Sequence, residues 1–188
     1  MIWLIIGPSC AGKTQFVTNS FIGNSKLVCT KDIIKVTESD TSYLIGDWTL
    51  DAKVRGTDKI ARQHLKLIVP QIEKLMSKGD KDIVAEGVNI CWSFVLDNLI
   101  QYADQIKFVY VQCSLGASIY RNQKLGGTQR ERNIKATWTR TNNTFLKYNK
   151  FFDSYVVNTE FGIDFRTFSK DTAVLKKYTD EQISILAR

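Results

Sequence analysis

The stretch "IIGPSCAGKT", Ile5–Thr14, decides the fold of this chain. It matches the pattern G-x-x-x-x-G-K-[ST] at each defined position, which here are Gly7, Gly12, Lys13 and Thr14. A short apolar run, residues 2–6, precedes the glycines, and residues 13–21 can form a helix after them. Glycines let the backbone curl so that its N–H groups converge on one anion, and a helix N-terminus adds a positive dipole end. The stretch therefore predicts a phosphate-binding loop between a buried strand and a helix.

Each position of this loop has an expected role. The backbone from Gly7 to Thr14 would surround the phosphates, Lys13 would reach the β- and γ-oxygens, and the Thr14 hydroxyl would be a ligand of Mg²⁺. The nucleotide-binding set predicted from the motif is Gly7, Pro8, Ser9, Cys10, Ala11, Gly12, Lys13 and Thr14.

Working outward from the loop, apolar strand patterns alternate with helical ones five times. Strands are expected at 2–6, 26–30, 82–87, 106–113 and 154–158. Helices are expected at 13–21, 57–78 (kinked or split by Pro70), 93–103, 115–124, 133–150 and from about Lys170. Residues 31–55 have no clear pattern. The alternation predicts one three-layer α/β domain over residues 1–188, with a five-stranded parallel sheet, helices on both faces and ligands at the carboxyl ends of the strands.

An acidic residue is expected beside the loop. "DIVAEG", residues 82–87, places Glu86 at the carboxyl end of a buried strand, where it can join the Mg²⁺ shell, whereas Asp82 lies at the opposite end. The alternative is a strand-end carboxylate that only faces solvent.

A third feature is the arginine-rich stretch "YRNQKLGGTQRER", which predicts a lid over about 121–133. Arg121, Arg130 and Arg132 would stabilise charge on the transferred phosphoryl group, with Gly126 and Gly127 as a hinge. The alternative is a solvated basic face.

This order of motifs resembles the nucleoside-monophosphate-kinase-like and polynucleotide-kinase-like P-loop phosphotransferases over nearly the whole chain. The resemblance implies a P-loop NTPase fold, ATP and Mg²⁺. GTPases fit less well because no N-K-x-D motif is present.

In the polynucleotide-kinase group an Asp after the second strand is the general base, which points here to Asp32 of "VCTKD"; a loop or cap acid is the alternative. In "GDWTLDAKVRGTDKIARQ", residues 46–63, Trp48 can stack on a base or pack in the core, Arg55 can hold a phosphate, and Asp58 is the next candidate for the base. "RGTD" also resembles a stretch of phage P-loop kinases, including those that phosphorylate 5-hydroxymethyluracil in DNA.

The charge distribution favours a polyanionic acceptor. Residues 121–150 hold eight basic residues and one acid, which equals the whole net charge of +7. The basic helix also carries Trp138, Phe145 and Tyr148. We therefore expect an ATP-dependent kinase acting on DNA. The alternatives are a (deoxy)nucleoside monophosphate kinase and a nucleotide-dependent binding module.

The remaining composition predicts a cytoplasmic protein, in a bacterial host if it is phage-encoded. No apolar run has the length of a membrane span, and "MIWLII" is expected to be a strand, not a signal peptide. The four cysteines form no C-x-x-C pair and are expected to be reduced thiols.

Overall fold

A computed structural model describes residues 1–49, 55–127, 129–160, 168–170 and 176–177 of the chain. Its centre is a mixed sheet with the strand order β2-β3-β4-β5-β1-β6-β7-β8. The neighbouring pairs β4–β5, β5–β1, β1–β6 and β6–β7 are parallel, and the three outer pairings are antiparallel. The strands are β1 (Ile2–Ile6), β2 (Val28–Cys29), β3 (Val36–Glu38), β4 (Ser42–Ile45), β5 (Asp82–Glu86), β6 (Ile106–Gln112), β7 (Asp153–Asn158) and β8 (Lys176–Lys177).

Four of the expected strands are present, but the strand expected at 26–30 is not in the parallel part of the sheet. Only Val28–Cys29 form a strand there, on the outer edge, with Val28 59% exposed. The place beside β5 is taken by β4, whose four residues are all buried. The prediction of a purely parallel, five-stranded sheet is therefore wrong. Its cause is a hairpin, β3–β4, within residues 31–55, where a strand of four residues leaves too short a pattern to recognise.

Helical segments connect the strands. They are α1 (Lys13–Val17) with the π-helical turn η1 (Thr18–Ile22), the 3₁₀ segments η2 (Gly56–Lys59) and η3 (Arg62–Leu67), α2 (Ile68–Met76), η4 (Val88–Cys91), α3 (Ser93–Leu99), η5 (Ile100–Gln105), α4 (Leu115–Lys124) and α5 (Glu131–Tyr148).

The expected helix 57–78 is split. Its first part forms η2 and η3, and the α-helix begins only at Ile68. Pro70 lies in the first turn of α2, where its missing N–H costs no intrahelical hydrogen bond. The helix expected from about Lys170 falls mostly outside the described residues. Where the chain is described, at Lys176–Lys177, it forms β8, so that prediction is wrong for these two residues.

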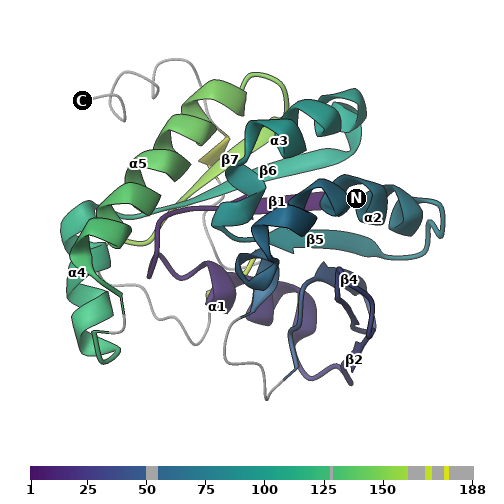
Figure 1. The fold of residues 1–188 in the computed structure, drawn as a ribbon, viewed down its shortest axis with the longest axis horizontal. Coiled ribbons are helices and arrows are strands. Elements are labelled where there is room, and N and C mark those ends of the chain that lie inside the picture. Colours follow the sequence, from purple (N-terminus) through teal and green to yellow (C-terminus); the bar gives the residue numbers. More distant parts are fainter. Residues whose placement is uncertain (50–54, 128, 161–167, 171–175, 178–188) are drawn as a thin grey trace.

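Two apolar clusters lie on opposite faces of the sheet, so helices cover both, as expected. In β1, Ile2, Leu4 and Ile6 point into one cluster and Trp3 and Ile5 into the other. Figure 1 shows α2, α3 and α5 along the first face and α1 on the second. Complete burial of β1 explains why its sequence is a continuous apolar run.

Candidate functional site: a glycine loop at the centre of the sheet

The loop between β1 and α1 has the backbone of an anion-binding turn. Three of its residues have positive φ: Gly7 (155°), Cys10 (59°) and Gly12 (97°). A Cβ at Gly7 would collide with the carbonyl oxygen of Val111 in β6, so only glycine fits there. Cys10 is the one non-glycine residue in the described part of the chain with positive φ, which costs about 1–2 kcal/mol. Such turns bring successive N–H groups to one concave side.

Lys13 and Glu86 form a buried pair beside this loop. The Lys13 Nζ lies 3.9 Å from the Glu86 Oε1 and donates a hydrogen bond to the Pro8 carbonyl at 2.9 Å. Both side chains are almost completely buried. Burial raises the pKa of Glu86 to about 8; Lys13 opposes this shift and the charge of Asp58 adds to it. The strand-end acid therefore faces the interior, and the solvent-facing alternative does not describe it.

Thr14 and Glu86 are the residues expected to hold Mg²⁺. Thr14 lies exposed in the first turn of α1, next to Lys13. Among the described residues, no three His, Cys, Asp or Glu side chains form a metal-binding group. A hydroxyl and one carboxyl group suit Mg²⁺, which takes few protein ligands and completes its shell with phosphate oxygens and water, and Glu86 would lose its proton on binding the cation.

The "RGTD" stretch packs directly on the Glu86 end of β5. Thr57 donates a hydrogen bond from Oγ1 to the Glu86 carbonyl at 2.9 Å. The Asp58 Oδ1 accepts from the backbone N–H groups of Val88 (2.6 Å) and Asn89 (3.2 Å). A Cβ at Gly56 would collide with the Glu86 carboxylate. Asp58 is thus brought close to the Lys13–Glu86 pair.

Arg121 also reaches the glycine loop. This half-buried residue of α4 lies with its guanidinium 3.5 Å from the Cys10 carbonyl. It also donates to the carbonyls of Thr159 and Glu160, the latter at 2.7 Å. Arg121 is therefore tied to the carboxyl end of β7 as well as to the loop, and lies on a helix instead of a mobile segment.

Arg130 and Arg132 lie at the start of α5 and are both exposed. Gly126 and Gly127, with φ of 93° and 60°, close the end of α4, where their N–H groups donate to the carbonyls of Gln123 and Asn122. The same helix touches the glycine loop one turn further on, where the hydroxyls of Ser9 and Thr137 lie 3.0 Å apart. Arg130 and Arg132 therefore lie at the start of a helix that contacts the glycine loop.

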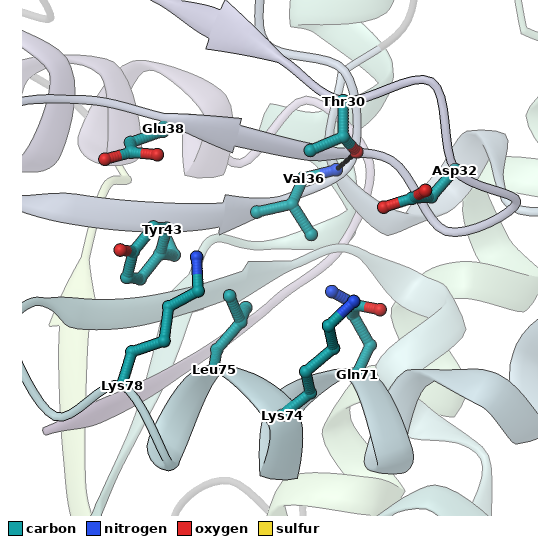
Figure 2. A pocket seen from close by; sticks show the side chains of 9 residues that line it. All are labelled: Thr30, Asp32, Val36, Glu38, Tyr43, Gln71, Lys74, Leu75 and Lys78. Carbon is teal, nitrogen blue, oxygen red and sulfur yellow. Dashed lines mark hydrogen bonds between the residues drawn. The ribbon is translucent and has the colours of Figure 1, made fainter.

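Asp32 is remote from this centre. It is exposed and lines a small pocket with residues of β3, β4 and α2, which Figure 2 shows from close by. The pocket has a volume of about 80 Å³, far below the roughly 300 Å³ of small ligand sites. β2, which ends before Asp32, is the fourth strand from β1, or about 19 Å away at the usual strand spacing. The loop-acid alternative describes Asp32 better than the general-base assignment.

Trp48 is a core residue, so its expected role in stacking on a base is wrong. Its side chain is 1% exposed, belongs to the apolar cluster with Phe16, and donates from Nε1 to the Ile45 carbonyl at 3.3 Å. Arg55 is half-buried immediately before η2, near the proposed acceptor side.

One acid that the sequence reasoning left without a role is Asp47. It directly follows β4, the strand beside β5, and its Oδ2 accepts a hydrogen bond from Lys35 at 2.8 Å. That bond, with those from Thr49, lowers the pKa of Asp47 to about 2. Only recognition of β4 would have drawn attention to it.

The aromatic residues of the basic helix have different roles. Phe145 and Tyr148 are buried in the core, whereas Trp138 is half-buried and donates to the Cys113 carbonyl at 3.0 Å. The mixture of aromatic and basic residues in α5 therefore follows from its packing and is not by itself a nucleic-acid signal. All four cysteines are free thiols, as expected.

Comparison with known protein families finds none that matches this chain, and comparison with curated proteins finds no significant match. Within the described residues, no helix is long and apolar enough to span a membrane.

Proposed function

We propose that this protein is an ATP- and Mg²⁺-dependent kinase with a P-loop NTPase fold. It would transfer the γ-phosphate to a hydroxyl on a nucleic acid, most specifically the hydroxymethyl group of 5-hydroxymethyluracil in DNA. The observation that carries the proposal is the strained glycine loop with Lys13 and Glu86 buried together beside it.

The position of the loop in the sheet supports a nucleotide at this place. β1 lies between β5 and β6 in the sheet. After β1 the chain forms β2 to β5 on one side of this strand and then crosses to form β6 and β7 on the other side. Ligands of open α/β sheets bind at such a switch point, beyond the carboxyl ends of the strands.

The residues around the loop have complementary expected roles. Lys13 would contact the β- and γ-phosphates, and Thr14 and Glu86 would hold Mg²⁺, which neutralises charge on the phosphate oxygens when it is bound. Arg121 would act close to the loop, and Arg130 and Arg132 would approach the γ-phosphate from the start of α5.

Asp58 is the general base that the contacts favour. Its Oδ1 is held by two backbone N–H groups, and its Oδ2 has no partner among the described residues. The substrate hydroxyl oxygen would attack the γ-phosphorus while the bond to the β–γ bridging oxygen breaks. ADP leaves with that electron pair, and the hydroxyl proton passes to Asp58.

The choice of a DNA acceptor rests on the net charge concentrated in residues 121–150 and on the resemblance of the "RGTD" stretch. A base within a duplex would have to be flipped out to reach the γ-phosphate. Arg55 would then lie near a phosphate of the acceptor strand.

One transfer assay tests the function. γ-Labelled ATP is offered with deoxynucleoside monophosphates, plain DNA, DNA with 5′-hydroxyl ends, and DNA containing 5-hydroxymethyluracil. We expect label only in the last substrate and none with Lys13→Ala. Label only in monophosphates would overturn the DNA assignment, and ATP binding without transfer to any acceptor would favour a binding module.

A further inference from the structure

Two arginines from distant parts of the chain lie over the ring of Trp92. The guanidinium carbon of Arg62, in η3, is 4.9 Å from the centre of the indole ring, and that of Arg140, in α5, is 5.2 Å from it. A guanidinium placed over tryptophan is attracted by the negative face of the ring, so each contact favours this placement of the arginine. We call these three residues the Arg–Trp–Arg stack.

Both arginines present unused hydrogen-bond donors. They are exposed, and within the described residues neither makes a hydrogen bond or an ion pair with an acceptor. A guanidinium that stacks through its plane keeps its five N–H donors at the edge, directed away from the ring. Two such groups beside one ring, neither in an ion pair within the described residues, form a site that favours an anion with several acceptor oxygens.

The Trp92 ring is held by packing against the core and not by a hydrogen bond from its indole N–H. The Trp92 Nε1 is buried and has no acceptor in the part of the chain that the structure describes. Phe94, which is 41% exposed, contacts Trp92 with its ring centre 6.3 Å away. Because both guanidinium groups lie close to the indole, the chemistry offered to a ligand here includes their N–H donors.

The stack lies near the catalytic end of the sheet. Trp92 directly follows η4, which begins after Glu86 and Gly87 at the carboxyl end of β5. Arg140 lies three residues after Thr137, whose hydroxyl is 3.0 Å from that of Ser9 in the glycine loop. Residues three apart on a helix are neighbours on one face, with Cβ atoms about 5–6 Å apart. Arg140 is therefore within about one side-chain length of the phosphate loop.

We propose that Arg62 and Arg140, held by Trp92, bind an internucleotide phosphate of the acceptor strand. This proposal rests on the proposed function and adds to it a binding site for the acceptor strand, whose backbone would cross the carboxyl edge of the sheet between η3 and α5. Arginine forks match phosphate oxygens in pairs, and each neutralised phosphate releases counterions, so binding weakens as salt rises.

The test measures binding without requiring transfer. A fluorescein-labelled DNA strand is titrated with the wild-type protein, Arg62→Gln, Arg140→Gln and the control Lys78→Gln, and affinity is read from anisotropy at several salt concentrations. Lys78 stacks on Tyr43, 4.5 Å from the ring centre, at the other end of the strands, so the control removes the same charge and the same kind of contact elsewhere.

We expect each arginine variant to bind DNA about tenfold more weakly and to lower the salt slope by about one. ATP binding should stay unchanged, and the thermal midpoint should fall only slightly, because each exposed side chain loses one contact with Trp92. Arg62→Lys and Arg140→Lys should restore only part of the affinity, since an ammonium has no planar fork.

If Lys78→Gln lost as much DNA affinity as the arginine variants, the effect would reflect net charge alone and the proposed site would be wrong. Unchanged DNA affinity in both arginine variants would also overturn the proposal. The same proteins are also titrated with a free deoxynucleoside monophosphate. If the arginine substitutions weaken the binding of the monophosphate but not that of DNA, the assignment of the site to a polynucleotide is wrong. Loss of DNA binding in the variants, with no transfer by the wild type to any acceptor, would refute the proposed kinase while supporting the phosphate site.

Discussion

Gly56→Ala should destabilise the protein and disturb the Glu86 carboxylate at the same time. Gly56 has φ of +71°, and an added Cβ would meet the Glu86 carboxylate and lie 2.6 Å from the Glu86 carbonyl oxygen. Glu86 is fully buried against Lys13, so neither group can move aside without opening the pair.

The size of the effect can be separated into two parts with a matched control. Gly79, at the end of α2, has φ of +72°, but the nearest atom to an added Cβ is 3.9 Å away. Both substitutions incur the cost of a left-handed alanine, about 1–2 kcal/mol. Only Gly56→Ala adds overpacking, about 1–3 kcal/mol. We expect the free energy of unfolding to fall by about 2–5 kcal/mol in Gly56→Ala and by about 1–2 kcal/mol in Gly79→Ala.

Urea unfolding of both variants, followed by circular dichroism, measures this difference. ATP affinity, measured by calorimetry under conditions where both variants are folded, should fall in Gly56→Ala only. If the two variants lose equal stability and bind ATP equally well, Gly56 does not pack on Glu86 and the arrangement of "RGTD" beside β5 is wrong.

Four further predictions concern the site and the core. Glu86 keeps its proton to about pH 8 in the folded protein but loses it near pH 4.5 in the unfolded chain, so the free energy of unfolding should fall as the pH rises between these values. In Glu86→Gln the unfolding midpoint, measured over the same pH range, should fall less. Trp48→Ala should cost about 3–5 kcal/mol of unfolding free energy, whereas Trp48→Phe, if the residue only packs, should leave the KM for the acceptor unchanged. Asp58→Asn should lower kcat at least about 100-fold and Asp32→Asn should not; the reverse result would restore Asp32 as the base. Changing Arg130 and Arg132 together to Ala should lower kcat about 100-fold or more without moving the melting temperature, and near-normal activity would leave them as surface residues.

The parts of the fold with strong local signals were predictable from the sequence. The strands β1, β5, β6 and β7 each contain a run of consecutive apolar residues, although β7 is only partly buried, and the glycine pattern marks the turn after the first. β4 was not predictable because four residues, "SYLI", are too few to distinguish a strand from other apolar stretches. Without β4, the sequence points to Asp32 as the first candidate for the general base and to Asp58, which follows β4 in the chain, only as the second.

The acceptor side depends on contacts that no sequence pattern encodes. Glu86 and Lys13 were each identified from local motifs, but the packing of Asp58 against Val88 joins segments 30 positions apart. The same holds for Arg62 and Arg140, which are far apart in the chain and come together only because both lie over the ring of Trp92. Local propensity carries no information on such pairings, so a sequence alone can name the candidates but not group them.

The central position of β1 has a consequence for how the chain folds. Ile2 pairs with Ile83 on one side and with Ile106 on the other, roughly 80 and 100 positions later in the chain. The glycine loop therefore cannot take its final shape on the ribosome until most of the protein has been synthesised, since Gly7 packs against Val111. High contact order of this kind slows folding, so we expect nucleotide-binding competence to appear late in refolding, after the helices have formed.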